Sequence, residues 1–128
     1  MASPKFSNAS QSFHGELKSR INAYFAQAGK SPTGNFSLYF KAIVLVISFL
    51  FVYIHLVFYT PTTWLAITEC VVLGGLTAAI GFNIMHDGMH GSFSRHKWVN
   101  QLAGLSLNFL GANNFMWRSK HNIIHHTY

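Results

Sequence analysis

The chain has 128 residues, of which half are hydrophobic and only 9% are charged. This balance is typical of membrane proteins and argues against a soluble domain of this size. The net charge of +6 could suit nucleic acid, but residues 42–94 contain no Lys or Arg, five basic residues precede them and four follow them. Because basic residues gather on the cytoplasmic side of membrane proteins, we expect both ends to be cytoplasmic and expect no nucleic-acid partner.

Residues 1–41 are predicted to be a cytoplasmic N-terminal segment. Within it, apolar residues recur at helical spacing over residues 13–28, with Lys18 and Arg20 elsewhere on the helical wheel. This pattern predicts an amphipathic helix. Such a helix can lie in the lipid headgroup layer or dock on a later part of the protein, and the sequence does not separate these alternatives.

Residues 42–85 are predicted to form a transmembrane helical hairpin. Residues 42–59 carry no formal charge and at about 1.5 Å per residue they cover about 27 Å, near the thickness of the hydrocarbon core of a bilayer. Residues 60–63 allow only a tight reversal. The second span, over residues 64–85, then returns to the first side and brings His86 to the membrane surface.

Two polar residues interrupt the predicted hairpin. His55 and Glu69 each fall about one helical turn from the reversal. An ionisable residue inside a membrane usually has a partner or a function. We therefore predict that His55 and Glu69 form a hydrogen-bonded pair within the membrane, far from any metal.

Residues 86–128 contain two histidine clusters. Residues 86–90 read His-Asp-Gly-Met-His, and residues 121–126 read His-Asn-Ile-Ile-His-His. Positions four apart on a helix differ by about 40°, so each cluster places a histidine pair on one face. Imidazole is a favoured ligand for iron, copper, zinc and nickel. The clusters therefore predict a shared metal site with five candidate ligands: His86, His90, His121, His125 and His126.

The tandem histidines place a restriction on this site. His126 lies about 100° further round a regular helix than His125, so His121, His125 and His126 cannot all face one ion. Either the helix is distorted there, or the three histidines serve two ions. The isolated His14 and His96 are interpreted as ordinary surface or core residues.

Residues 97–117 connect the two clusters and decide whether they can meet. Apolar residues are interrupted by five Asn or Gln side chains. A full membrane crossing would place the clusters on opposite sides of the bilayer, and basic residues flank the segment on both sides. We therefore predict a re-entrant or interfacial helical segment, with Gly104 and Gly111 as break points.

The two clusters, placed after a hydrophobic hairpin, resemble known histidine boxes. The string His-Asp-Gly-Met-His-Gly-Ser at 86–92 and the string Trp-Arg-Ser-Lys-His-Asn-Ile-Ile-His-His-Thr-Tyr at 117–128 resemble the first and second boxes of membrane fatty acyl desaturases. The N-terminal segment resembles that of bacterial members related to linoleoyl-CoA desaturases. The resemblance implies an all-α membrane protein, in which a transmembrane hairpin follows an amphipathic helix and the histidine-box region lies on the cytoplasmic side.

The resemblance also implies a chemistry. Members of the family hold two iron ions with histidines from three boxes and use dioxygen and two electrons to insert a double bond into an acyl chain. It implies that His86, His90, His121, His125 and His126 are iron ligands, and that Asp87 and Asn122 orient them. The implied partners are an acyl-CoA or acyl-lipid substrate, membrane lipid and a separate electron donor of the ferredoxin or cytochrome b5 type. The implied membrane is a bacterial inner membrane or an endoplasmic reticulum.

The chain departs from the family pattern at two points. Three residues separate His121 from His125 where the common second box has two, which leaves open whether His121 and His126 bind the same iron. The sequence also stops at Tyr128, before the third box and second hairpin that the family implies. We therefore expect an N-terminal part of a longer enzyme, or a truncated product, that is inactive by itself.

Three alternatives remain at the level of sequence. A histidine-box hydroxylase or ketolase would share the ligands. A non-catalytic membrane metal binder or transporter would have ionisable residues along a path through the membrane, whereas only His55 and Glu69 lie there. A purely structural hairpin leaves the histidine spacing unexplained. The acyl carrier, the double-bond position and the electron donor cannot be predicted from the residues.

Overall fold

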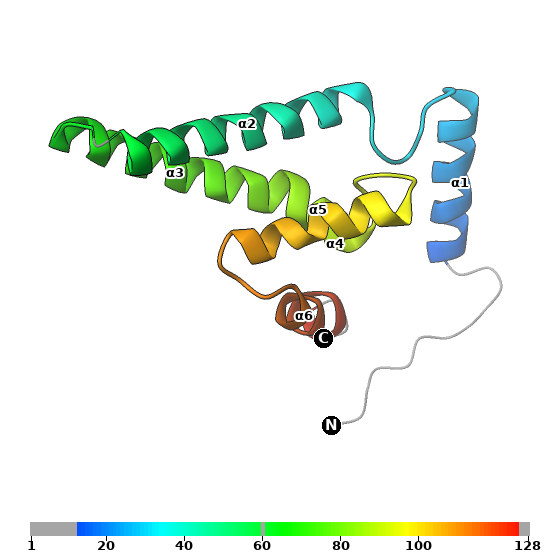
Figure 1. Ribbon diagram of the computed structural model, residues 1–128. Helices are drawn as coiled ribbons and strands as arrows, with labels where there is room; N and C mark the ends of the chain where they lie inside the picture. Colours follow the sequence, from blue (N-terminus) through cyan, green and yellow to red (C-terminus); the bar gives the residue numbers. More distant parts are fainter. Residues whose placement is uncertain (1–12, 60, 126–128) are drawn as a thin grey trace.

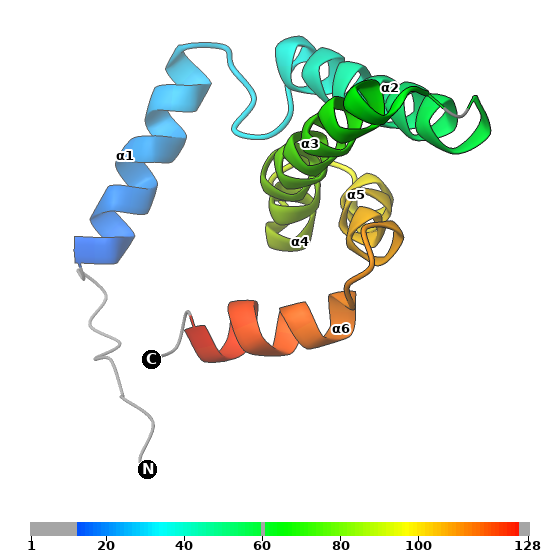
Figure 2. The same ribbon diagram turned by 90° about the vertical axis from the view of Figure 1, so that its left-hand side faces the viewer.

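The computed structural model describes residues 13–59 and 61–125. Every regular element in these residues is a helix, and they contain no β-strand. The predicted all-α class is therefore confirmed. Two long helices form a hairpin, a shorter helix packs beside the end of the second, and the C-terminal helix crosses beneath them (Figures 1 and 2).

Helix α1, Phe13–Gln27, matches the predicted N-terminal helix. It ends just before Gly29, whose φ of 60° is a left-handed conformation that glycine adopts without strain. No α1 residue is buried, and the helix stands apart from the hairpin in both ribbon views (Figures 1 and 2). Docking on a later part of the chain is thus not seen within the described residues.

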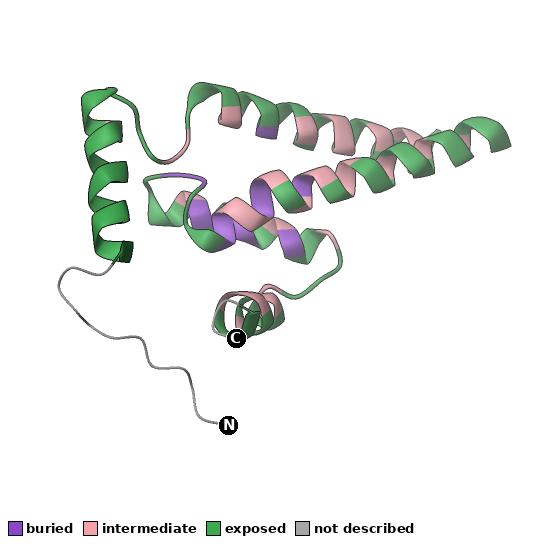
Figure 3. Cartoon of the chain, turned by 180° about the vertical axis from the view of Figure 1, so that it is seen from behind, coloured by how far each residue is buried: buried purple, intermediate pink, exposed green. Residues whose placement is uncertain are grey.

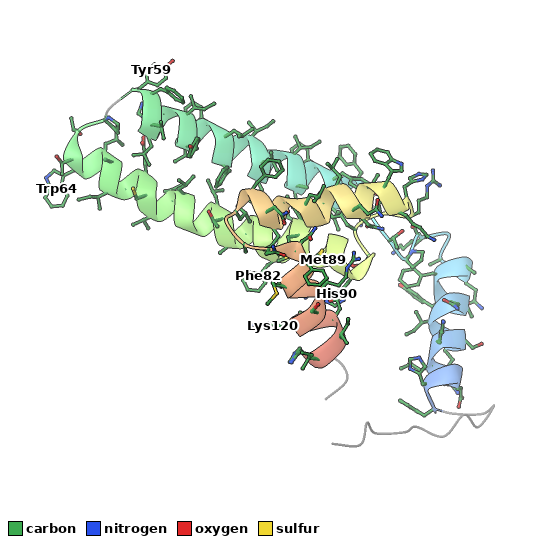
Figure 4. All side chains as sticks on the ribbon, turned by 60° about the horizontal axis from the view of Figure 1, so that its bottom comes forward. Tyr59, Trp64, Phe82, Met89, His90 and Lys120 are labelled. Carbon is green, nitrogen blue, oxygen red and sulfur yellow. The ribbon has the colours of Figure 1, made fainter. Side chains whose placement is uncertain are left out.

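Helices α2, Phe36–Phe58, and α3, Thr63–Ile80, form the predicted hairpin. Helix α2 begins six residues before the predicted span because the Asn35 side chain caps it, accepting a hydrogen bond from Leu38 N at 2.8 Å. Tyr59 and Trp64 both lie at the tip of the hairpin, far from His90 (Figure 4). This arrangement leaves the flanks of the hairpin exposed, as expected for surfaces that face lipid.

The second apolar helix continues beyond α3 as one rod. A π-helical segment, η1, covers Gly81–Met85, and α4 covers His86–His90. The whole stretch Thr63–His90 is 28 residues of continuous helix, long and apolar enough to cross a membrane. Asn83 in η1 accepts a hydrogen bond from Lys41 Nζ at 2.7 Å, which ties this segment to α2. The first histidine box is therefore the last turn of an apolar helix.

Helix α5, Lys97–Phe109, packs against η1 and α4. At 13 residues and about 1.5 Å per residue it is about 20 Å long, too short to cross a bilayer. The buried residues gather where α5 meets the end of the long helix (Figure 3). They form two neighbouring clusters: Ala42, Ile80, Ile84, Phe93 and Ala103, and Met85, Met89 and Leu107.

The two predicted break points behave differently. Gly111 has a φ of 86° and lies just past the end of α5, as predicted. The prediction for Gly104 was wrong, because this residue is buried within α5. A Cβ atom on Gly104 would lie 2.8 Å from Met89 Sδ. Gly104 is therefore a point of close packing between helices and not a break.

The C-terminal helix consists of α6, Asn114–Trp117, and a π-helical segment η2, Arg118–His125. The Asn113 side chain caps its start, accepting hydrogen bonds from Phe115 N at 2.9 Å and Met116 N at 3.1 Å. The described part of the second histidine box, residues 121–125, thus lies in a distorted helix. His126 lies outside the described residues, so the two alternatives for the tandem histidines both stay predictions.

Candidate metal centre

The first pair of candidate ligands comes from the last turn of the long helix. His86 and His90 lie four residues apart in α4, so they share one face, and their ring centroids are 4.6 Å apart. Gly91 ends the helix directly after His90 with a φ of 74°. The side chain of His86 is half-buried and that of His90 is exposed, so the pair lies at an accessible helix end.

The C-terminal helix brings a third imidazole to this pair. The His121 ring centroid lies 5.5 Å from that of His86 and 5.3 Å from that of His90. One ligand atom from each of the three residues lies within 4.8 Å of the others. Three imidazole nitrogens that share one ion at about 2.1 Å lie on average no more than about 3.6 Å apart. The nitrogens would therefore have to approach one another by about 1 Å for all three to hold one transition metal ion.

The two remaining candidate ligands are His125 and His126. The His125 ring centroid is 5.3 Å from that of His121, and its side chain is exposed. His125 does not belong to the three-histidine group. His126 lies outside the described residues. Three of the five predicted ligands are thus brought together, and His125 extends the row by one turn.

Trp117 packs against all three imidazoles, a role that sequence reasoning missed. Its ring stacks on His121 with centroids 4.2 Å apart and an interplanar angle of 24°. It meets His86 and His90 edge to face, at 5.8 Å and 5.7 Å. Its position four residues before His121 was the available signal, because residues four apart share a helix face.

Asp87 and Asn122, the predicted orienting residues, make different contacts. Asp87 Oδ1 lies 3.6 Å from His86 Nδ1, which is too long for a hydrogen bond. Asn122 Nδ2 donates to the Met89 carbonyl at 3.0 Å, across 33 positions of sequence. This hydrogen bond connects the second box directly to the backbone of the first. Asn122 Oδ1 is buried with no hydrogen-bond partner within the described residues.

We expect Asn122→Leu to weaken metal binding, because the second box loses its hydrogen bond to the first. Loss of such an orienting group typically lowers metal affinity by about 10- to 100-fold. The measurement is a metal titration of the purified chain, with Asn22→Leu as the control because Asn22 is exposed on α1, away from both boxes. Equal affinities of Asn122→Leu and the parent chain would show that this hydrogen bond does not position the ligands.

Asn100 is the second residue that the sequence did not single out for the site. It is buried in α5 and its amide makes three hydrogen bonds to the loop that follows α4. Its Nδ2 donates to the carbonyls of Gly91 at 3.2 Å and Ser94 at 2.7 Å, and its Oδ1 accepts from Ser94 N at 2.8 Å. These bonds fix the loop directly after His90 and so hold the first box against α5.

The structure also brings His55 and Glu69 together near the tip of the hairpin. His55 Nδ1 lies 2.7 Å from Glu69 Oε1, with side chains 35% and 15% exposed. The contact has the distance of an ion pair but not the geometry of a hydrogen bond. It connects α2 to α3 at the end of the hairpin that lies furthest from the three-histidine group (Figure 4).

We expect Glu69→Ala to destabilise the hairpin by about 1 kcal/mol, the scale of polar contacts between membrane helices. The free energy of unfolding, measured by denaturant titration in detergent micelles, checks this value. Cys70→Ala is the matched control because Cys70 is the adjacent residue and is exposed. Equal stability of the two variants would mean that the pair adds nothing to the hairpin.

Comparison with known proteins gives a consistent result. Residues 62–128 match the family model described as fatty acid desaturase. The chain is 38% identical over 116 residues to an sn-1 linoleoyl-lipid 6-desaturase of Arthrospira platensis, and 35% identical over 117 residues to one of Synechocystis sp.. It is 26% identical over 118 residues to an acyl-lipid (8-3)-desaturase of Physcomitrium patens. No solved structure matches the chain.

These alignments cover nearly all of this chain but only a part of each relative. The first two alignments cover 91% of this chain but 32% of each relative, and the third covers 92% of this chain and 25% of its relative. The chain thus spans about a third of the length of the linoleoyl-lipid desaturases it matches. The matched residues include both histidine boxes, and the chain belongs to the fatty acid desaturase family.

Proposed function

We propose that the chain supplies the first two histidine boxes of a membrane-bound desaturase that inserts a double bond into the acyl chain of a lipid. One observation carries this proposal. His86, His90 and His121 converge within 4.8 Å from helices far apart in sequence, at the end of a 28-residue apolar helix. A metal held there lies at the depth where an acyl chain in the bilayer meets the aqueous phase.

The described residues fit one of the two iron ions that the family implies. Histidine is a ligand that suits iron, and three imidazoles already share one locus. Iron supplies, together with dioxygen, an oxidant for unactivated methylene groups that no protein side chain can supply. We propose that His86, His90 and His121 hold one ion, and that His125 and His126 contribute to the second.

The surrounding residues have supporting roles in this proposal. Trp117 shields one side of the imidazoles from water and fixes the ring of His121 by stacking. Asn122 fixes the second box against the first. Asp87 lies beside His86 Nδ1, where its negative charge favours that nitrogen as the protonated one and leaves the other nitrogen for the metal.

The proposed partners follow from the same desaturase function. The relatives are named for acyl-lipid substrates, so we propose an acyl-lipid in preference to an acyl-CoA, with dioxygen and a separate electron donor of the ferredoxin or cytochrome b5 type. The distribution of basic residues supports a multi-pass protein with both ends cytoplasmic. We propose that these 128 residues alone are inactive, because five histidines leave at least one of the two ions with fewer than three imidazoles.

An iron titration tests the metal site directly. We expect the detergent-purified chain, free of other metals, to bind ferrous iron, and His86→Ala to lose that binding by at least about tenfold in affinity. His96→Ala is the matched control, because His96 is an exposed histidine in the loop after the first box. Equal iron binding by His86→Ala and His96→Ala would contradict the proposed site.

A further inference from the structure

A pocket of about 540 Å³ opens beside the candidate metal centre. Its walls come from the first histidine box, from α5 and from the start of η2. The box contributes Met89 and His90, α5 contributes Lys97 and Gln101, and the C-terminal helix contributes Arg118. Small-molecule sites have volumes of about 300–1,000 Å³. The volume of this pocket therefore suits a small ligand.

The pocket is basic and contains no acidic side chain. Lys97 and Arg118 line it from two different helices. The chain has only three acidic residues. Glu16 contacts Arg20 and Glu69 contacts His55, while Asp87 lies beside His86 and does not line the pocket.

The two cations therefore have no counter-charge within the described part of the chain. No hydrogen bond or ion pair of the Lys97 or Arg118 side chain is found among the described residues. Two like charges that line one cavity repel each other, so an anion that binds between them is favoured. The counter-charge for this pocket must then come from outside these residues.

The position of the pocket indicates which anion is available. His90 is the last residue of the 28-residue apolar helix, so the pocket lies where the hydrocarbon region gives way to the headgroup layer. Phosphate groups occupy that layer, and Arg binds phosphate through two parallel hydrogen bonds while Lys binds it as a point charge. A phosphate held by Lys97 and Arg118 would be next to His90, one of the proposed ligands.

We propose that this pocket binds the phosphate group of the acyl carrier and so orients the acyl chain toward the metal centre. The inference rests on the proposed desaturase function and names the carrier as a phosphate-bearing molecule. Two carriers share this chemistry, a glycerophospholipid and coenzyme A. A galactolipid, which has an uncharged headgroup, does not.

Binding of defined probes to the full 128-residue chain tests the inference without any need for activity. The chain in neutral detergent is titrated with dioleoylphosphatidylglycerol, with coenzyme A and with monogalactosyldiacylglycerol, and the bound ligand is measured by native mass spectrometry. The variants are Lys97→Gln and Arg118→Gln. The matched control is Lys120→Gln, because Lys120 is exposed on the same helix as Arg118 but does not line this pocket.

We expect at least one phosphate probe to bind more tightly than the galactolipid, and each pocket variant to raise its Kd by about tenfold. Lys120→Gln should change the Kd less than twofold. Tight binding of phosphatidylglycerol or of coenzyme A then identifies the source of the phosphate. Equal binding of all three probes, or equal weakening by Lys120→Gln, would overturn the inference.

The same samples separate this inference from the proposed function. Ferrous iron binding by Lys97→Gln and Arg118→Gln is measured beside probe binding, with helix content checked by circular dichroism. Iron retained without any phosphate preference would overturn the carrier pocket and leave the proposed desaturase site standing. Phosphate preference without iron binding would support the pocket and contradict the metal centre.

Discussion

Replacing Gly88 with alanine is expected to lower the free energy of unfolding by about 3 kcal/mol, the upper range for overpacking a buried site. Gly88 lies in the first box, between His86 and His90, and α5 packs directly against it. A Cβ atom there would lie 2.7 Å from Ala103 Cβ, 2.8 Å from Asn100 O and 2.8 Å from Gly104 N. Two of these three atoms are backbone, so relief requires α5 itself to move.

The expected displacement of α5 also affects the metal centre. Asn100 fixes the loop after His90 from α5, and Leu107 of α5 packs with Met85 and Met89. We therefore expect Gly88→Ala to weaken ferrous iron binding as well as stability. Denaturant titration in detergent micelles, followed by circular dichroism, measures the first effect, and an iron titration measures the second.

Gly81→Ala is the matched control for this substitution. Gly81 lies in the same continuous helix, and a Cβ atom there would meet no heavy atom within 4 Å. Because alanine is the better helix former, Gly81→Ala should be neutral or stabilising by up to about 1 kcal/mol. If Gly88→Ala were as stable as Gly81→Ala, the close packing of α4 against α5 at Gly88 would be contradicted.

The sequence was sufficient to predict the features that depend on local periodicity and charge. The helix after Phe13, the hairpin, and the pairing of His86 with His90 all follow from helical spacing or from the length of apolar runs. The contact between His55 and Glu69 follows from their equal distance from the reversal. Each of these depends on residues that are close in sequence or fixed by one turn.

Features that depend on contacts between distant helices were not predictable in the same way. Gly104 resembles a helix break in sequence, yet it is a packing position because Met89 lies against it. Asn100 resembles a polar interruption, yet it is buried and holds the loop after the first box. The π-helical geometry of Gly81–Met85 also has no signal in local composition. These outcomes depend on which helix surfaces pack against each other. The patterns in a single sequence do not contain that information.

Replacing Trp117 with alanine is expected to weaken ferrous iron binding by about 10- to 100-fold, the effect typical of losing a group that orients metal ligands. Trp117 stacks on His121 at 4.2 Å and packs against Met85, Met89 and Leu107. Removal of the indole leaves a void at the point where the two boxes meet. The ring of His121 would then be free to rotate, and the three nitrogens would no longer be held close together.

A rescue experiment separates this positioning role from a general loss of stability. Trp117→Phe retains an aromatic face for stacking on His121 and should restore iron affinity to within about fivefold of the parent chain. Trp98→Ala removes an indole that is 66% exposed and should leave iron binding unchanged. With Trp64 and Trp98 replaced by Phe, the fluorescence of Trp117 gives a second signal, because ferrous iron held by the surrounding imidazoles should quench it. If Trp117→Ala bound iron with the same affinity as the parent chain, the histidines would be positioned without this ring.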